Sequence, residues 1–307
     1  MKYRLTKTEI RKELLKCGKD PVYFINNYIK IAHPMKGLIP FKLYKFQEET
    51  VKDFIDHRYN IVLKARQLGI STTIAGYVAW LMLFHRSKNV VVMATKLSTA
   101  ANLVKKVKLA MKSLPNWMMI SQIVIDNRNS FKLDNESEVK AISTSGDAGR
   151  SEALSLLVVD EAAFVENMSE LWAGLLPTLS TGGDCIIAST PFGVGNLFHK
   201  LYSEAEQEMN NFNAIRLPWD VHPDRDQEWF EKETKNMSKR EVAQELLCNF
   251  NMSGETLLSG DDLKTLNKKI TEPIYKTGFD RNLWIWETYE PKKKYFLTAD
   301  VARGDGK

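Results

Sequence analysis

Apolar residues form short continuous runs through the middle of the chain, and longer stretches with helical spacing stand between them. The runs, which are rich in β-branched residues, are 61–63, 90–94, 156–159 and 185–188. The stretches with helical spacing are 45–57, 71–86, 98–113 and 168–176. Strands of a parallel sheet are covered by helices on both faces and therefore appear as continuous apolar runs. The alternation predicts an α/β fold with a doubly wound, mostly parallel sheet.

The segments on either side of this region have other patterns. Residues 120–142 predict a small antiparallel insertion, and the first 35 residues predict short helices that end at His33-Pro34. Beyond about residue 200 the chain is polar and helical in pattern. A Gly/Ser/Asp-rich break around "MSGETLLSGDD" predicts a linker, and a new β-type segment begins near Trp284.

Composition and charge narrow the classes of protein only slightly. The 307 residues are 44% hydrophobic and 26% charged, as in ordinary globular proteins, and are enough for a substantial core. The net charge of +5 mildly favours an anionic partner but is far from a concentrated nucleic-acid-binding patch. Three widely spaced cysteines predict reduced thiols. With no signal peptide, and with its longest apolar run at about 75–84, the sequence predicts no membrane partner.

The strand at 61–63 leads into a loop that is similar to a phosphate-binding loop. The sequence "KARQLGIST" places Gly69 and a following hydroxyl, Ser71, at the start of the next helix. Backbone N–H groups and the helix dipole favour an anion at such a site, and the Ser71 hydroxyl would bind Mg²⁺. Ile70, however, occupies the position at which this motif has lysine.

An acidic pair follows the strand at 156–159, about 90 residues after the loop. Asp160 and Glu161 stand where a Walker B element places its acids: Asp160 would bind Mg²⁺ and Glu161 would polarise the attacking water. A helix cap that uses acidic residues is the alternative explanation, although capping does not require two acids after an apolar strand.

Two weaker signals flank these motifs. The strand at 185–188 ends in Ser189-Thr190, whose hydroxyls could sense the γ-phosphate. Phe46 and Gln47 precede the first strand, and a glutamine amide can pair with both a donor and an acceptor on the adenine edge. Taken singly, each is equally consistent with a strand-ending turn or a surface helix.

In this order and spacing, the motifs resemble those of the large terminase subunit, the DNA-packaging motor of tailed bacteriophages. "ARQLGIST" resembles its Walker A loop, "LLVVDEAAF" its Walker B element, "IIASTPFG" its coupling motif and "YKFQ" its adenine-contacting element. The resemblance covers about residues 20–307. It implies a P-loop NTPase fold of the RecA/ASCE type, with a small helical subdomain and the start of an RNase H-like nuclease domain.

The resemblance also implies domain boundaries. The ATPase domain is expected at 1–250, with its core at about 43–205 and a helical subdomain formed by about 1–35 and 206–250. A linker and lead-in are expected at 251–283, followed by the beginning of the nuclease domain at 284–307.

Roles in nucleotide binding and hydrolysis follow from the resemblance by position. Gln47, with Phe46, would contact adenine. The loop residues around the phosphates would be Arg66, Gln67, Leu68, Gly69, Ile70, Ser71 and Thr72. Asp160 and Glu161 would handle metal and water, and Ser189 and Thr190 would couple hydrolysis to movement. Arg150, in the Gly-bracketed "GDAGRSEAL", occupies the position of an arginine finger supplied by a neighbouring subunit, and an ordinary solvated loop arginine is an equal alternative.

Because Ile70 stands where the motif has lysine, another basic residue would have to supply the positive charge. Lys64, at the strand end, and Arg66, in the loop, could each bring positive charge to the β- and γ-phosphates. We expect ATPase activity to be retained, and the sequence leaves open which of the two residues supports it.

The carboxyl end resembles the first strand of the family's nuclease domain. In "YFLTADVARGDG", Asp300 is the expected first metal ligand, and Asp305 is a weaker candidate. Cleavage with two Mg²⁺ or Mn²⁺ ions needs further carboxylates from later strands, and only seven residues follow Asp300. We expect a fragment of a longer protein or a split gene, and no nuclease activity from this polypeptide alone.

The resemblance implies ATP and Mg²⁺ as ligands. It implies double-stranded viral DNA, the portal protein ring, the small terminase subunit and a homo-oligomeric ring, expected to be a pentamer, as partners. The expected location is the host cell cytoplasm, with transient attachment to the procapsid and absence from the mature virion.

Two other classes of protein are alternatives. A superfamily 2 helicase usually has His or Asp where Ala163 stands and needs a second RecA-like lobe, for which the roughly 60 residues from Pro191 to Phe250 are too few. A non-hydrolysing nucleotide- or DNA-binding module, disabled by Ile70, is the other.

Overall fold

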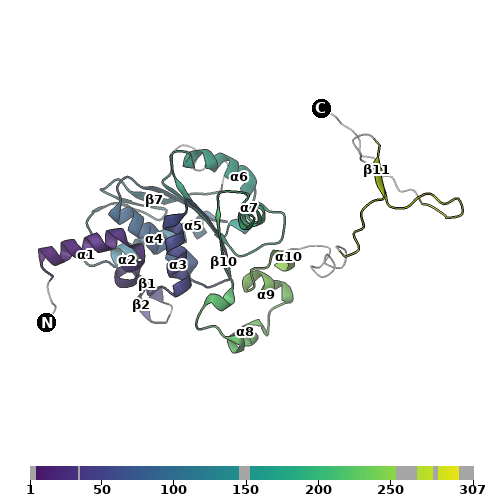
Figure 1. Cartoon of the computed structure of the whole chain (residues 1–307). Coiled ribbons are helices and arrows are strands. Elements are labelled where there is room, and N and C mark those ends of the chain that lie inside the picture. Colours follow the sequence, from purple (N-terminus) through teal and green to yellow (C-terminus); the bar gives the residue numbers. More distant parts are fainter. Residues whose placement is uncertain (1–4, 34, 145–152, 254–267, 279–282, 297–307) are drawn as a thin grey trace. The chain divides into compact units, whose positions relative to one another are not determined.

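The computed structural model describes residues 5–33, 35–144, 153–253, 268–278 and 283–296 (Figure 1). The chain divides into two compact units, Met1–Leu257 and Leu258–Lys307. The strands are β1 Lys30–His33, β2 Gly37–Pro40, β3 Tyr59–Lys64, β4 Asn89–Met93, β5 Ile123–Asp126, β6 Ser130–Leu133, β7 Glu138–Ala141, β8 Leu156–Asp160, β9 Asp184–Ser189, β10 Asn213–Leu217, β11 Tyr275–Thr277 and β12 Leu283–Ile285. The α-helices are α1 Lys7–Lys19, α2 Pro21–Tyr28, α3 Lys45–Asp56, α4 Ile70–Phe84, α5 Leu97–Lys112, α6 Met168–Leu175, α7 Leu197–Glu206, α8 Gln227–Thr234, α9 Lys239–Glu245 and α10 Phe250–Ser253. Short 3₁₀ turns are η1 Ala162–Phe164, η2 Leu176–Leu179 and η3 Trp219–Val221.

One large sheet organises the first unit. Its strand order is β10-β3-β9-β8-β4-β7-β6-β5, and the strands from β10 to β7 are parallel. The four expected apolar runs are strands β3, β4, β8 and β9, and the four expected helices are α3 to α6, so the predicted α/β class is confirmed.

Two parts of the sheet differ from the expectation. The residues expected to form a separate antiparallel insertion do form the antiparallel pairs β5–β6 and β6–β7, but β7 also pairs in parallel with β4, so they extend the main sheet. Strand β10 lies where a helical pattern was expected. It is an edge strand in which only Ile215 and Leu217 are buried, so its sequence lacks a continuous apolar run.

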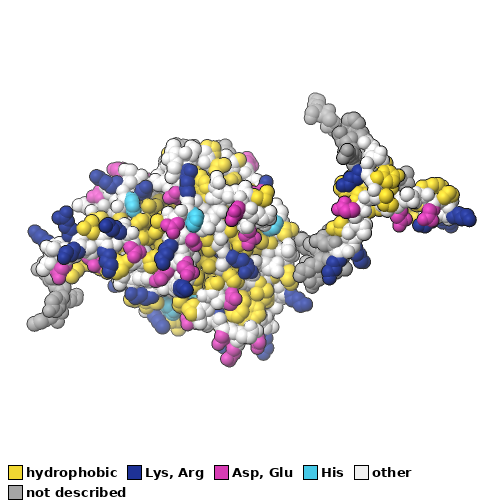
Figure 2. All heavy atoms as spheres, viewed as in Figure 1, with side chains coloured by type: hydrophobic (Ala, Val, Ile, Leu, Met, Phe, Trp, Pro, Cys, Tyr) yellow, Lys and Arg dark blue, Asp and Glu magenta, His cyan; other side chains and the backbone are white. Residues whose placement is uncertain are grey.

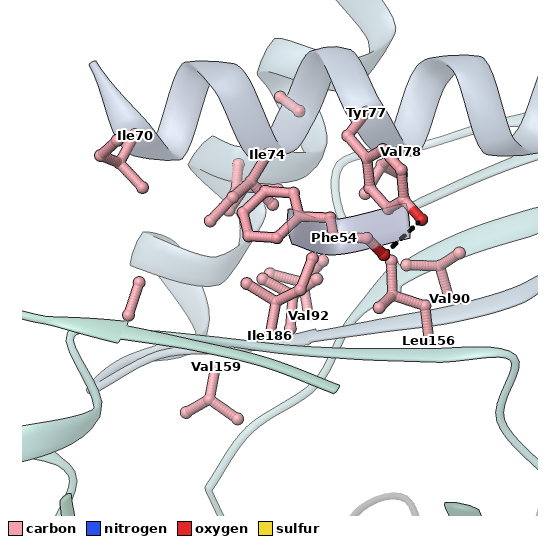
Figure 3. Packing of buried hydrophobic residues seen from close by; sticks show 14 of the residues in the cluster. Phe54, Ile70, Ile74, Tyr77, Val78, Val90, Val92, Leu156, Val159 and Ile186 are labelled. Carbon is pink, nitrogen blue, oxygen red and sulfur yellow. Dashed lines mark hydrogen bonds between the residues drawn. The ribbon is translucent and has the colours of Figure 1, made fainter. Parts of the chain in front are cut away.

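Helix α4 lies at the centre of the core. Figure 3 shows Ile74, Tyr77 and Val78 on α4 facing Val90 of the sheet, whereas Val159 extends from the opposite face of the sheet. Nearly every residue of α4 is buried because α2, α3 and α5 pack around it in addition to the sheet. Burying large apolar side chains in this way contributes about 1.5–3 kcal/mol each.

The first two helices pack on this core. Thr6 and Glu9 form a capping box at the start of α1, and α2 packs against α3 and α4. At Gly76 a Cβ atom would lie 3.2 Å from Cγ1 of Ile25, so the close approach of α2 to α4 requires glycine or a displacement of Ile25.

The predicted domain boundaries stay a prediction. In the second unit, β11 and β12 form an antiparallel pair, and β11 falls within the range expected to be linker. The β-type segment expected near Trp284 is β12.

The charged side chains and the cysteines are distributed as the composition leads us to expect. On the face shown in Figure 2, basic and acidic side chains of the described residues are interspersed. Cys17, Cys185 and Cys248 are free and buried, and burial raises the pKa of the Cys17 and Cys248 thiols to about 12. Across the described segments, none of the helices has both the length and the apolar character required to span a bilayer.

Candidate functional site

The polar residues of three motifs meet at one edge of the sheet. Strand β9 lies between β3 and β8, with Leu63 opposite Ser189 and Asp160 opposite Ala188. Because the strands are parallel, their carboxyl ends lie together, which is where ligands bind in open α/β sheets. The motifs read separately in the sequence therefore form one site.

The loop between β3 and α4 turns sharply at Gly69. Gly69, at the N-terminus of α4, has φ 74°, a conformation that glycine adopts at little cost. A Cβ atom there would lie 2.8 Å from Nε2 of Gln47. The glycine is thus required by both the turn and the neighbouring side chain.

Lys64 and Glu161 form an ion pair at the end of these strands. The Lys64 Nζ atom donates to Oε1 of Glu161 at 3.1 Å. The Lys64 side chain is 8% exposed, whereas that of Glu161 is 34% exposed. Glu161 also has a left-handed backbone, with φ 55° and ψ 42°, which is unusual for a residue with a side chain. A buried cation is thereby held on the expected catalytic carboxylate.

Ser71 and Asp160 lie beside this pair. The Ser71 Oγ atom donates to Oδ2 of Asp160 at 2.7 Å, and Oδ1 of Asp160 accepts from the Glu161 backbone N–H at 3.1 Å. Mg²⁺ prefers hydroxyl and carboxylate oxygens as ligands. A serine hydroxyl and a carboxylate at this separation fit such an ion, although within the described residues no group of three or more His, Cys, Asp and Glu forms a candidate metal cluster.

Arg66 points to the helical segment that follows β10. Its guanidinium donates to Oε2 of Glu245 at 3.2 Å, and its backbone N–H donates to the Glu245 carbonyl at 2.7 Å. The Arg66 side chain is 69% exposed and that of Glu245 is 16% exposed. Gln244 donates to the other carboxylate oxygen of Glu245 at 2.9 Å.

Gln47 supports the loop in this structure. Its Nε2 donates to the Leu68 carbonyl at 2.8 Å, its Oε1 accepts from the Tyr44 backbone N–H at 3.0 Å, and the residue is 2% exposed. One amide hydrogen is left for another partner, so a contact to adenine stays a prediction. Phe46 is buried and stacks on Tyr44, which also contacts the ring of His222.

Of the two expected coupling residues, Ser189 is buried and Thr190 lines a cavity. Ser189 is fully buried, and its hydroxyl accepts from the Ala163 backbone N–H at 3.1 Å, which ties the end of β9 to the turn after β8. Thr190 lines a cavity of about 450 Å³, together with Arg66, Thr95, Glu161, Phe164, Gln244 and Glu245. The cavity is thus lined by residues of the loop after β3, of the turn after β8 and of the end of β9.

A further lysine approaches the site from α5. Burial lowers the pKa of Lys106, Asp160 opposes that change, and Lys64 adds to it. Lys106 thus lies within electrostatic reach of Asp160.

The structure brings five of the predicted residues together in one place. Lys64, Ser71, Asp160, Glu161 and Thr190 converge. Ile70 is 2% exposed and belongs to the core, as Figure 3 shows. Arg150, Asp300 and Asp305 lie outside the described residues.

Sequence reasoning missed Arg225, Glu245 and Lys106. Arg225 and Glu245 lie in a polar helical region without a motif, far along the chain from the loop, and α5 has several lysines of which only the fold places Lys106 near Asp160.

Known proteins are similar to this chain in sequence and in fold. Residues 61–265 match the family described as "Terminase large subunit, T4likevirus-type, N-terminal". The large terminase ATPase domain of Thermus phage P74-26 is similar over 68% of this chain and 94% of its own length, with 19% identity and a TM-score of 0.59.

Two longer relatives show the same fold. The large terminase of bacteriophage HK97 is similar over 82% of this chain, with 19% identity and a TM-score of 0.57, and this chain covers 51% of it. The large terminase of another thermophilic bacteriophage, in complex with ADP, is similar over 67% of this chain, with 14% identity and a TM-score of 0.55, and 53% of it is covered. The chain thus spans about half the length of these two relatives.

Proposed function

This chain belongs to the terminase large subunit family of the T4 type, and from that premise we propose that it is the ATP-hydrolysing motor subunit that moves double-stranded viral DNA into a procapsid. The observation that carries the proposal is the 2.7 Å contact of Ser71 with Asp160. It joins the Walker A helix to the Walker B strand at the edge where nucleotide phosphates would bind.

Lys64 is the residue we assign to the phosphates in place of the missing Walker A lysine. It is already at the carboxyl edge of the sheet, largely buried and within 3.1 Å of the catalytic carboxylate. A buried cation interacts with phosphate more strongly than an exposed one because less water screens it. As the phosphates bind, Lys64 would turn its ammonium from Glu161 toward them, which leaves Glu161 free to act as a base.

Arg66 is less well placed than Lys64 to bind the phosphates in this conformation. Its guanidinium is exposed and bound to Glu245, so contact with a phosphate requires it to leave that carboxylate. Exposed ion pairs contribute only about 0–1 kcal/mol, so the exchange costs little. We therefore assign Arg66 a secondary role in phosphate binding.

Ser71 and Asp160 would hold Mg²⁺, which neutralises charge on the phosphates when it is bound. Glu161 then accepts a proton from the water that attacks the γ-phosphorus, and the bond between this atom and the β,γ-bridging oxygen breaks to leave ADP and phosphate. Ser189 and Thr190 would couple hydrolysis to movement. Thr190 lines the same cavity as Glu161, and Ser189 holds the turn that follows Glu161.

The remaining assignments come with the proposed function. They are a homo-oligomeric ring on the portal, the small terminase subunit as partner, Arg150 as a finger for the neighbouring subunit, and action in the host cytoplasm. They also include Asp300 as the first ligand of a nuclease site for Mg²⁺ or Mn²⁺.

The direct test is steady-state release of phosphate from MgATP by the purified chain, with and without double-stranded DNA. We expect hydrolysis by the wild type, and none by Glu161→Gln, which keeps nucleotide binding. A wild-type chain that binds ATP without hydrolysing it would instead be a non-hydrolysing nucleotide-binding module.

A further inference from the structure

Three consecutive carbonyls of the Walker A loop are held by side chains from outside it. Arg225 donates from one guanidinium nitrogen to the carbonyl of Arg66 at 3.2 Å and from another to that of Gln67 at 3.1 Å. Gln47 donates to the next carbonyl, that of Leu68, at 2.8 Å. Each peptide group from residue 66 to residue 69 therefore has its oxygen fixed.

Fixing the oxygens also fixes the N–H groups. In a planar trans peptide the C=O and the following N–H point in opposite directions, and no cis peptide occurs among the described residues. The N–H groups of Gln67, Leu68 and Gly69 are therefore directed away from Arg225 and Gln47. Gln67 and Gly69 are both left-handed, at φ 58° and 74°, and such turns form concave N–H nests that bind anions.

Arg225 is itself held in place. Its guanidinium lies 4.5 Å from the centre of the Trp229 ring, and Trp229 stacks on Trp219 with ring centres 5.9 Å apart. Asp226 caps the start of α8 by accepting from the Trp229 backbone N–H at 2.8 Å. These contacts restrain the donor before any nucleotide arrives.

We propose that Arg225 is a positioning residue that presets the Walker A loop for phosphate binding. This proposal rests on the proposed ATPase function. The loop lacks its usual lysine at residue 70, and Arg225 supports it from the side opposite the N–H groups. In this role Arg225 acts on the loop backbone and not on the nucleotide itself.

The shape of the guanidinium suits this role. Its planar fork presents two donors at once and can span two successive carbonyls, whereas a lysine ammonium is a single compact charge. A lysine at residue 225 would hold one carbonyl and leave the adjacent peptide free to turn.

The test compares Arg225→Met and Arg225→Lys with a matched control, Arg216→Met. Arg216 also donates to a backbone carbonyl in this region, that of Leu247 at 2.9 Å, and this carbonyl lies outside the loop. MgATP hydrolysis gives KM and kcat, mant-ADP fluorescence gives nucleotide affinity, and urea unfolding gives stability.

We expect Arg225→Met to raise KM and the mant-ADP Kd about 10-fold with kcat within about 3-fold, because uniform binding is lost while the chemical step is kept. Arg225→Lys should give an intermediate KM, and Arg216→Met should match the wild type in KM, kcat and Kd.

The proposal is overturned if Arg225→Met and Arg216→Met have the same KM and Kd. It is also overturned if Arg225→Met lowers kcat and stability together while Arg225→Lys behaves like the wild type, because that result describes a purely structural residue. A wild type that binds mant-ADP but hydrolyses no ATP refutes the proposed function, and the Kd comparison still decides the role of Arg225. A wild type that binds no nucleotide refutes both.

Discussion

Replacement of Lys64 by methionine tests whether Lys64 or Arg66 supplies the positive charge at the phosphates, a question that the sequence leaves open. Methionine keeps most of the apolar length of the lysine side chain and removes the ammonium that donates to Glu161 at 3.1 Å. The matched change is Arg66→Met, which removes the guanidinium bound to Glu245.

The expected size of the effect follows from burial. Loss of one preorganised donor to developing charge in a desolvated site lowers kcat by about 100- to 1000-fold, or about 2.7–4 kcal/mol. The Lys64 side chain is 8% exposed, which places it in that class, whereas Arg66 at 69% exposure is well screened. We expect Arg66→Met to lower kcat by about 10-fold or less, since exposed pairs contribute at most about 1 kcal/mol.

Stability must be measured beside activity, because Lys64 is also part of an ion pair. Glu161 is 34% exposed, so water can solvate its carboxylate once the lysine is gone. The free energy of unfolding in urea should therefore fall by no more than about 1 kcal/mol. The rates come from steady-state phosphate release at saturating MgATP.

A Lys64→Met enzyme that hydrolyses ATP at the wild-type rate, beside an inactive Arg66→Met enzyme, would reverse the assignment. Loss of both rate and folded structure in Lys64→Met would show instead that the ion pair is structural and that solvation of Glu161 was overestimated.

Other changes test the proposed base, the loop after β3 and the core. Glu161→Gln should lower kcat by about 100-fold or more, while mant-ADP binds with unchanged Kd. Hydrolysis near the wild-type rate would remove Glu161 from the mechanism. Gly69→Ala should raise KM and destabilise the fold by about 1 kcal/mol or more, because φ is 74° and the new Cβ would lie 2.8 Å from the Gln47 amide; an unchanged KM and melting temperature would contradict this. Gly76→Leu should lower the urea midpoint by an amount equivalent to about 1–3 kcal/mol through overpacking against Ile25, and an unaltered midpoint would show that α2 can move away freely.

Much of the fold could be predicted because its central strands are buried on both faces. Such strands have unbroken apolar runs, as in β8, and acidic residues directly after them are conspicuous. Strand β10 could not be predicted in the same way, because an edge strand buries only some of its residues and its five residues lie within a polar region.

The site was predictable where its residues follow strands and unpredictable where it depends on distant side chains. Lys64 and Asp160 end strands β3 and β8, Glu161 follows β8, and Ser71 lies in the first turn of α4, so topology alone brings them together. Arg225 lies 158 residues from Gln67, the nearer in sequence of its two loop contacts, in a segment without periodicity, and only the folded chain brings them into contact. Family motifs could not indicate that Gln47 would donate to the loop backbone.

The backbone of Glu161 has a consequence for how this protein can change. A residue with a side chain costs roughly 1–2 kcal/mol in the left-handed region, and glycine does not incur that cost. Glu161→Gly should nevertheless destabilise the protein, because it leaves the largely buried Lys64 ammonium without its carboxylate partner, and an unpaired buried charge costs about 3–5 kcal/mol. The ion pair thus keeps the proposed base in a backbone conformation that side chains disfavour, so selection for stability and selection for turnover should both retain Glu161.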